Sequence, residues 1–223
     1  MNDVFLTGGT GYMGGRLVPA LLARGHRVHV LARAGSAGRI APGAQPVIGS
    51  ALDADSFAAS VPAAATFVQL VGTPHPGPGK EAEFVRVDLT AARAGVEAAR
   101  RARARHFVYV SVAQPAPVMR AYVDARAEGE RAIREAGLTA TILRPWYVLG
   151  PGHWWPVALL PLYGLARLVP SLTDGARRLG LVTLPRMVGA LVYAVENPPP
   201  EGEARILDVP AIRRAHPAES RRS

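Results

Sequence analysis

The residues with the clearest chemical use in this chain are four glycines near its start. They stand at positions 8, 9, 11 and 14, after a run of β-strand formers at 4–7 and before a helical pattern with Leu17 and Leu21 on one face. Glycine permits positive φ angles and close backbone approach, and the first turn of a helix presents unpaired N–H groups that attract an anion. A strand, a glycine turn and a helix in this order are typical of a dinucleotide-binding site.

The glycine spacing fits two forms of the dinucleotide fingerprint. Gly9-x-Gly11-x-x-Gly14 is one, and Gly8-x-x-Gly11-x-x-Gly14 is its variant. A purely structural glycine turn is the alternative interpretation. The residues expected to contact the cofactor in this stretch are Gly8, Thr10, Gly11, Tyr12, Met13 and Gly14.

A second candidate contact follows the next expected strand, at 27–33. An acidic residue at the end of that strand would bind the ribose 2′-hydroxyl of NAD, but this chain has Arg33 there, with Ser36 and Arg39 nearby. A guanidinium suits a 2′-phosphate, so the sequence predicts NADP as cofactor, with NAD as the alternative. Stacking on the adenine or capping of the strand is the other role open to Arg33.

Strands and helices alternate along the first two thirds of the chain. Strands are expected at 27–33, 46–49, 65–72, 106–111 and 138–143, with helices at 80–104, 121–136 and 183–196 and a final strand at 205–209. Apolar strands separated by helices predict an α/β fold with a doubly wound, mostly parallel sheet and a ligand at the carboxyl ends of its strands. Cofactor contacts are therefore also expected from Val71, Gly72 and Thr73, where the 65–72 strand ends.

The domain organisation follows from breaks in this pattern. Residues 1–150 are expected to form the cofactor-binding core, 151–212 a small lid that completes the same domain around the substrate, and 213–223 a disordered tail. The uncharged segment at 154–166 is too short and too interrupted by proline to span a bilayer. It is interpreted as a lid, with peripheral membrane contact or packing against another copy or a protein partner as alternatives.

Composition narrows the class of protein. The net charge is +9, but the arginines are scattered through helices and the tail without an aromatic platform, so no nucleic acid is expected as a partner. Cysteine is absent, which excludes disulfides and thiolate metal sites; no metal is expected, and a reducing, cytoplasmic location fits. A small molecule is the expected substrate.

Further motifs carry a family resemblance. They are Ser111 at the end of the fifth strand, the Tyr122-x-x-x-Arg126 spacing, and Arg144-Pro145-x-x-x-x-Gly150-Pro151-Gly152. With the glycine stretch, they resemble an atypical short-chain dehydrogenase/reductase, similar to the extended, NmrA-like and epimerase-related branch of this NAD(P)-binding Rossmann family. The resemblance covers roughly residues 1–210.

In active members of that family a serine, a tyrosine and a lysine do the chemistry. Carried over by position, the catalytic candidates are Ser111, Tyr122 and Arg126. The tyrosine passes a proton to or from the substrate oxygen, the serine orients the substrate, and the lysine holds the nicotinamide ribose. The resemblance also implies cofactor contacts from Leu52, Arg126, Pro145 and Val148.

Two departures from the family pattern matter. Arg126 replaces the lysine, and Ser111 and Tyr122 stand only eleven residues apart. An ordinary amphipathic pair of Tyr122 and Arg126 is the alternative interpretation, with Glu130 paired to Arg126 or Arg134 one turn further along. The expected function is an NADP-dependent oxidoreductase acting on a small apolar carbonyl or alkene through Tyr122. The alternatives are a catalytically silent redox sensor or accessory subunit, and a peripheral membrane or quinone-linked protein.

Overall fold

The central feature of the fold is a seven-stranded parallel sheet. The computed structural model describes residues 2–73, 77, 79–116, 119–152 and 180–215. The strands are β1 (Asp3–Thr7), β2 (Arg27–Ala32), β3 (Gln45–Ile48), β4 (Thr66–Gln69), β5 (His106–Val110), β6 (Ala140–Leu143) and β9 (Ala204–Leu207). Their order is β3-β2-β1-β4-β5-β6-β9, and each neighbouring pair is parallel. The predicted doubly wound Rossmann sheet is therefore confirmed.

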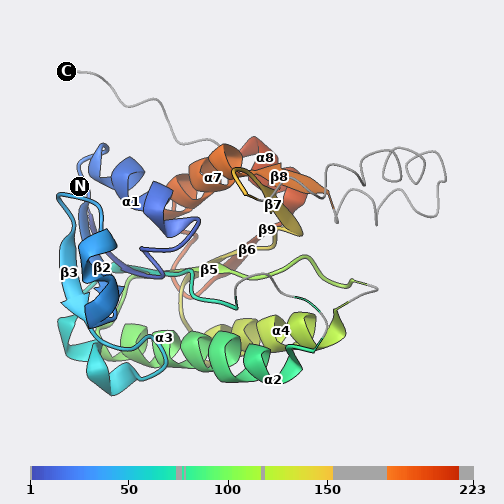
Figure 1. The fold of residues 1–223 in the computed structure, drawn as a ribbon, viewed down its shortest axis with the longest axis horizontal. Coiled ribbons are helices and arrows are strands. Elements are labelled where there is room, and N and C mark those ends of the chain that lie inside the picture. Colours follow the sequence, from blue (N-terminus) through green and yellow to red (C-terminus); the bar gives the residue numbers. More distant parts are fainter. Residues whose placement is uncertain (1, 74–76, 78, 117–118, 153–179, 216–223) are drawn as a thin grey trace.

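Helices cover both faces of this sheet (Figure 1). One layer holds α1 (Gly14–Leu22), α7 (Leu184–Glu196) and α8 (Val209–Arg214). The other holds α2 (Glu81–Glu83), the π-helical turn η4 (Phe84–Leu89), α3 (Thr90–Arg101) and α4 (Arg120–Glu135). Short 3₁₀ turns η1 (Ala34–Arg39), η2 (Ala54–Ser56) and η3 (Ala58–Ser60) connect β2 to β4 around β3.

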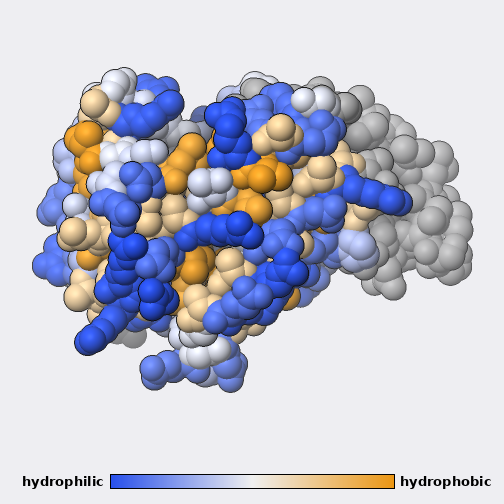
Figure 2. All heavy atoms as spheres, turned by 90° about the horizontal axis from the view of Figure 1, so that it is seen from below, coloured by the Kyte–Doolittle hydropathy of each residue, from blue (hydrophilic) through white to orange (hydrophobic). Residues whose placement is uncertain are grey.

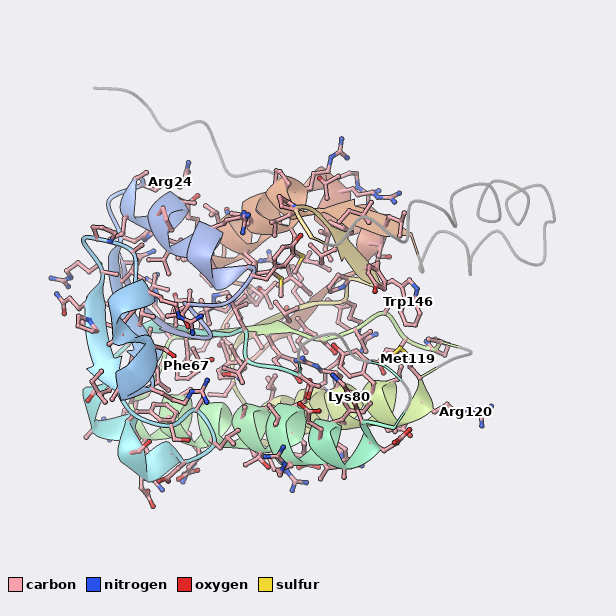
Figure 3. All side chains as sticks on the ribbon, viewed as in Figure 1. Arg24, Phe67, Lys80, Met119, Arg120 and Trp146 are labelled. Carbon is pink, nitrogen blue, oxygen red and sulfur yellow. The ribbon has the colours of Figure 1, made fainter. Side chains whose placement is uncertain are left out.

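Successive residues of each strand point into different hydrophobic layers. Val4 and Leu6 pack with α1 and α7, whereas Phe5 between them packs on the side of α3 and α4. On that side Phe5, Phe67 and Phe107 occupy matching positions on three neighbouring strands. Their ring centroids lie 5.3 and 5.2 Å apart, and Phe67 is labelled in Figure 3. This aromatic row fixes the register of the central strands.

Glycines end two of the helices. Gly25 has φ +78°, and the N–H groups of His26 and Gly25 donate to the carbonyls of Leu21 and Leu22 at the end of α1. Gly137 has φ +65° and ends α4 with the same pattern of two hydrogen bonds. Both ends are Schellman motifs, which need the left-handed conformation that glycine adopts without steric cost.

The structure also contains elements that the sequence did not predict. A two-stranded parallel sheet joins β7 (Tyr147–Leu149) to β8 (Leu181–Thr183). Arg213 and Arg214 were expected to begin a disordered tail, but they lie in the last turn of α8, where Arg213 donates to the carbonyl of Leu181; residues 216–223 lie outside the described part of the chain. Asp208 caps this short helix by accepting from the N–H of Ala211. The segment 154–166, interpreted as a lid, lies outside the described residues.

Ion pairs lie along the surface of the layer that contains α3 and α4. Arg101 contacts both Glu97 and Asp55, and Arg93 lies 3.8 Å from Glu128 on the neighbouring helix. Figure 2 views the molecule from below Figure 1 and shows hydrophilic side chains spread over this face with hydrophobic ones between them. Within the described part of the chain, no helix has the length and apolar character needed to cross a membrane.

Candidate functional site

The glycine turn after β1 packs so closely against its surroundings that two of its positions have no room for a side chain. Gly8 has φ +74°, and a Cβ on Gly14 would lie 2.2 Å from the Gly8 carbonyl oxygen. A Cβ on Gly9 would lie 2.4 Å from a methyl carbon of Val30. No described side chain caps the start of α1, and its first turn has no acidic residue. The N–H groups of Gly15 and Arg16 already donate to the carbonyls of Gly11 and Met13, and the positive end of the helix dipole favours an anion over this turn.

This turn forms one wall of a cleft of about 860 Å³ at the carboxyl ends of the strands. The cleft lies where the strand order reverses, because β2 and β4 flank β1 on opposite sides. Such a switch point is the usual ligand site of an open α/β sheet. Inside the sheet, the hydroxyl of Thr7 hydrogen-bonds to the buried side chain of Gln69 and joins β1 to β4 directly beneath the cleft.

The cleft brings together every residue that the sequence predicted to be catalytic or to contact the cofactor. Its wall includes Gly8, Thr10, Gly11, Tyr12, Met13, Gly14, Arg33, Leu52, Val71, Gly72, Thr73, Ser111, Tyr122, Arg126, Pro145 and Val148. They come from segments more than 100 residues apart, and the parallel sheet unites them because it aligns the carboxyl ends of its strands.

At the β2 end, the cleft is basic. Arg33 lies directly after β2, and Ser36 and Arg39 come from the η1 turn. The guanidinium of Arg39 donates to the hydroxyl of Ser36 over 3.1 Å. Among the described residues that line the cleft, the single acidic one is Glu83, which belongs to α2 and not to the β2 end. This end has donors for an anion and no carboxylate for a ribose hydroxyl.

At the opposite end, α4 presents three functional side chains on one face. Tyr122, Arg126 and Glu130 are spaced by four residues, so they lie on successive turns of the helix. The Tyr122 ring packs against Phe84, with centroids 5.1 Å apart, and the Arg126 guanidinium carbon lies 5.3 Å from the Tyr122 ring centroid. Tyr122 and Arg126 both line the cleft.

Arg126 is held on two sides. One arm donates from Nη1 to the carbonyl of Val110 over 2.9 Å, and Nη2 of the other arm lies 2.7 Å from Oδ1 of Asp88. Burial lowers the pKa of Arg126, but neighbouring Tyr122, Tyr109 and Asp88 outweigh burial and hold the pKa above its ordinary value. The guanidinium is therefore charged at physiological pH.

Of the two partners expected for Glu130, Arg134 is confirmed at 3.4 Å, whereas no ion pair joins Glu130 to Arg126. The arms of Arg126 are already taken, and the fully buried carboxylate of Glu130 instead meets Arg144 at 2.5 Å. It also accepts hydrogen bonds of 2.6 Å from Ser111 and Gln114. The hydroxyl hydrogen of Ser111 thus points to Glu130, and only its lone pairs are left for another group.

Asp88 is the main residue of this site that sequence reasoning missed. It is fully buried and stands four positions after buried Phe84, which places a carboxylate on the apolar face of the 80–104 helix. An acid within an apolar stripe was the available signal, because buried charges need partners. Arg86 and Trp146 also line the cleft without having been predicted. Figure 3 shows Trp146 at the end of the molecule where Met119 and Arg120 begin α4.

Comparison with known proteins agrees with this geometry. Residues 8–150 match the family described as NAD(P)H-binding. The ceramide reductase of Caulobacter vibrioides is 31% identical over 180 residues, which are 78% of this chain and 55% of the reductase. The 3-diazoavenalumate denitrifying reductase of a Streptomyces species is 31% identical over 223 residues, covering 87% of this chain and 72% of that protein. The chain thus spans little more than half the length of the first of these relatives.

Solved structures show the same fold at low sequence identity. A short-chain dehydrogenase/reductase superfamily protein of Agrobacterium tumefaciens with bound NAD has a TM-score of 0.66 and 17% identity, covering 92% of this chain and 77% of that one. The UDP-N-acetylglucosamine 4-epimerase of Bacillus cereus has a TM-score of 0.68 and 16% identity, covering 93% and 78%. The chain therefore belongs to the NAD(P)H-binding family, and its fold is that of the extended, epimerase-type short-chain dehydrogenases/reductases.

Proposed function

We propose that this protein is an NADP-dependent reductase that acts on a small, largely apolar carbonyl or alkene substrate, with Tyr122 as the proton donor. One observation carries the proposal: a single cleft joins the uncapped glycine turn, a basic pocket after β2 and the Tyr122 face of α4. The glycine turn suits the pyrophosphate, and the two ends of the cleft suit the two nucleoside halves.

The preference for NADP rests on Arg33, Ser36 and Arg39. Two guanidinium groups and a hydroxyl offer charge-assisted hydrogen bonds to a 2′-phosphate. The described residues at this end provide no carboxylate to accept a hydrogen bond from a free 2′-hydroxyl. Pro145 and Val148 line the cleft between the β6 end and Tyr122, where they suit the nicotinamide half.

When bound, the reduced nicotinamide supplies the hydride. For a carbonyl substrate, Tyr122 gives its hydroxyl proton to the oxygen as the carbon gains the hydride, which yields an alcohol and the oxidised cofactor. The charged guanidinium of Arg126, 5.3 Å from the centre of the Tyr122 ring, stabilises the negative charge left on the tyrosine oxygen. Solvent then returns the proton to Tyr122.

Ser111 acts here as an acceptor. Its hydrogen is donated to Glu130, so it orients a group that itself donates, such as the hydroxyl of the alcohol product. This differs from the donor role that a serine would have toward a ketone oxygen.

The apolar character of the substrate is supported by the names of two relatives. One is named a ceramide reductase, and another, from Stigmatella aurantiaca, is named a ketoreductase for a farnesyl-substituted dihydroquinoline oxide; the second is 27% identical over 168 residues, covering 66% of this chain and 50% of that protein. Ceramide and the farnesyl group both contain long hydrocarbon chains. Val110, Val112 and Trp146 give the Tyr122 end of the cleft an apolar surface of the same chemistry.

An assay with NADPH and a panel of apolar ketones, aldehydes and enones tests the proposal. We expect substrate-dependent oxidation of NADPH that falls at least about 100-fold in Tyr122→Phe, with NADPH affinity unchanged. Tyr193→Phe is the matched control, because Tyr193 lies on α7 outside the cleft. Equal rates in the wild type and Tyr122→Phe would exclude Tyr122 as the proton donor.

A second candidate, cofactor binding without turnover, is favoured by one specific observation. The guanidinium of Arg126 is engaged by Asp88 and Val110, and the hydroxyl of Ser111 is engaged by Glu130. Two of the three groups that family members use in chemistry thus have protein partners. Tight binding of NADPH together with no oxidation on any member of the panel would support this reading over the reductase.

A further inference from the structure

Asp88 lies at a point where three segments of the cleft wall meet. It belongs to η4, a π-helical turn between α2 and α3, and its side chain is fully buried. A π-turn inserts an extra residue into a helix and redirects its side chains, and such turns are frequent at functional sites. Here the turn sends a carboxylate between the loop after β4 and the start of α4.

Both oxygens of this carboxylate face donors. Oδ2 accepts from the backbone N–H of Thr73 over 2.9 Å and from its hydroxyl over 2.5 Å. Oδ1 lies 2.7 Å from Nη2 of Arg126. A carboxylate suits these surroundings because both of its oxygens accept hydrogen bonds. In an asparagine, the NH₂ group would have to face at least one of these donors.

Arg126 extends the same connection to the end of β5. Its planar fork joins the Val110 carbonyl to Asp88, and a Cβ on Gly72 would lie 2.0 Å from Nη2. The absence of a side chain at Gly72 therefore makes room for Arg126. A lysine amine, as a single point charge, does not have the two parallel arms that span these groups.

We infer that Asp88 is a positioning residue for the nicotinamide end of the cleft: through Thr73 and Arg126 it sets the distance between the loop after β4 and the end of β5. The guanidinium of Arg126 therefore has a fixed position in the cleft wall when the cofactor binds. The inference rests on the proposed function only in taking the Tyr122 end of the cleft as the nicotinamide end.

A comparison of two probes tests this role. NADPH fills both ends of the cleft, whereas adenosine 2′,5′-bisphosphate fills only the adenosine end. In Asp88→Asn we expect NADPH to bind at least about tenfold more weakly, with the affinity for adenosine 2′,5′-bisphosphate within about twofold of wild type. Equal weakening of both probes, or of neither, would overturn the inference.

A control separates positioning from general loss of stability. Ile133→Val shortens a fully buried side chain on α4 that does not line the cleft, so it lowers the melting temperature and leaves the ratio of the two affinities unchanged. Thr73→Val removes the hydroxyl group that donates to Asp88, and it replaces Asp88→Asn in this test if that variant does not fold. It should also weaken the binding of NADPH more than the binding of adenosine 2′,5′-bisphosphate.

A double-mutant cycle tests the connection through Arg126. Because Asp88 acts on the cleft through Arg126, the effects of Asp88→Asn and Arg126→Lys on NADPH affinity should not add. Additive effects would show that the two residues act separately and would contradict the inference. If the wild type prefers NADH, the proposed 2′-phosphate site fails, and the same ratio is measured with NADH and adenosine monophosphate. The role of Asp88 is thus decided independently of cofactor preference.

Discussion

The hydroxyl of Ser111 donates to the fully buried carboxylate of Glu130 over a distance of 2.6 Å. This hydrogen bond joins Ser111, the residue directly after β5, to α4. Arg144, the residue directly after β6, forms an ion pair with the same carboxylate. The buried carboxylate of Glu130 therefore connects the ends of β5 and β6 to α4, although Glu130 itself does not line the cleft. Replacement of Glu130 should therefore lower the stability of the fold more than it alters the chemistry in the cleft.

Removal of Glu130 should strongly destabilise the protein. Glu130→Ala leaves Arg144, Ser111 and Gln114 without their shared acceptor, so we expect a loss of about 3–5 kcal/mol in the free energy of unfolding. Urea denaturation measures this change. Glu135→Ala on the same helix is the control, because that side chain is 71% exposed and should cost less than about 0.5 kcal/mol. Similar midpoints for the two variants would contradict the buried-anion account.

Two adjacent glycines of the cofactor turn should respond in opposite ways to alanine. In Gly14→Ala the new Cβ would meet the Gly8 carbonyl oxygen at 2.2 Å, so the turn must shift, and we expect at least about tenfold weaker NADPH binding. In Gly15→Ala the new Cβ meets nothing within 4 Å on an exposed helical position. That variant should gain up to about 1 kcal/mol in stability with unchanged binding. Calorimetry and thermal unfolding give the two readouts.

Arg33 should govern the choice between NADPH and NADH. Because it stands at the end of β2 in the cleft wall, Arg33→Ala should weaken NADPH binding by about 10- to 100-fold, as expected for loss of a charge-assisted phosphate contact. NADH, which lacks the phosphate, should bind with little change. Fluorescence titration of both cofactors checks this. An equal loss for both would assign Arg33 to the adenine or to the strand end.

His106 should make stability depend on pH. Burial, followed by repulsion from Arg205 and Arg105, lowers the pKa of His106 from 6.5 to about 3. Between these values the unfolded chain binds the proton and the folded protein does not, so stability falls as pH falls below about 6.5. Between pH 7.5 and pH 5.0, His106 should lower the free energy of unfolding by about 2 kcal/mol. In His106→Gln, the free energy of unfolding measured by urea denaturation should fall correspondingly less steeply as the pH is lowered. An unchanged slope would show that His106 is protonated in the folded state.

The main elements of the fold and the outline of the cleft follow from local patterns. Apolar runs with β-branched residues and helical periodicity predicted most strands and helices, because each of these signals acts within a few residues. The cleft could be outlined for the same reason: in a parallel sheet, residues that follow strands meet at one edge. The β7 and β8 strands were missed since each has three residues and is stabilised by a partner far away in the chain.

The sequence alone therefore determined the sheet, the glycine turn and the helix face that carries Tyr122 and Arg126. Only the tertiary structure decided which charges meet. Arg126 pairs with Asp88 and not with Glu130, although Glu130 is its neighbour on the helix. Helical spacing brings only Glu130 near Arg126, because Asp88 lies on η4, far away in the chain. The choice is made by which groups the packing of η4, β5 and β6 buries beside it, because a buried charge must be neutralised by whatever partner lies within reach.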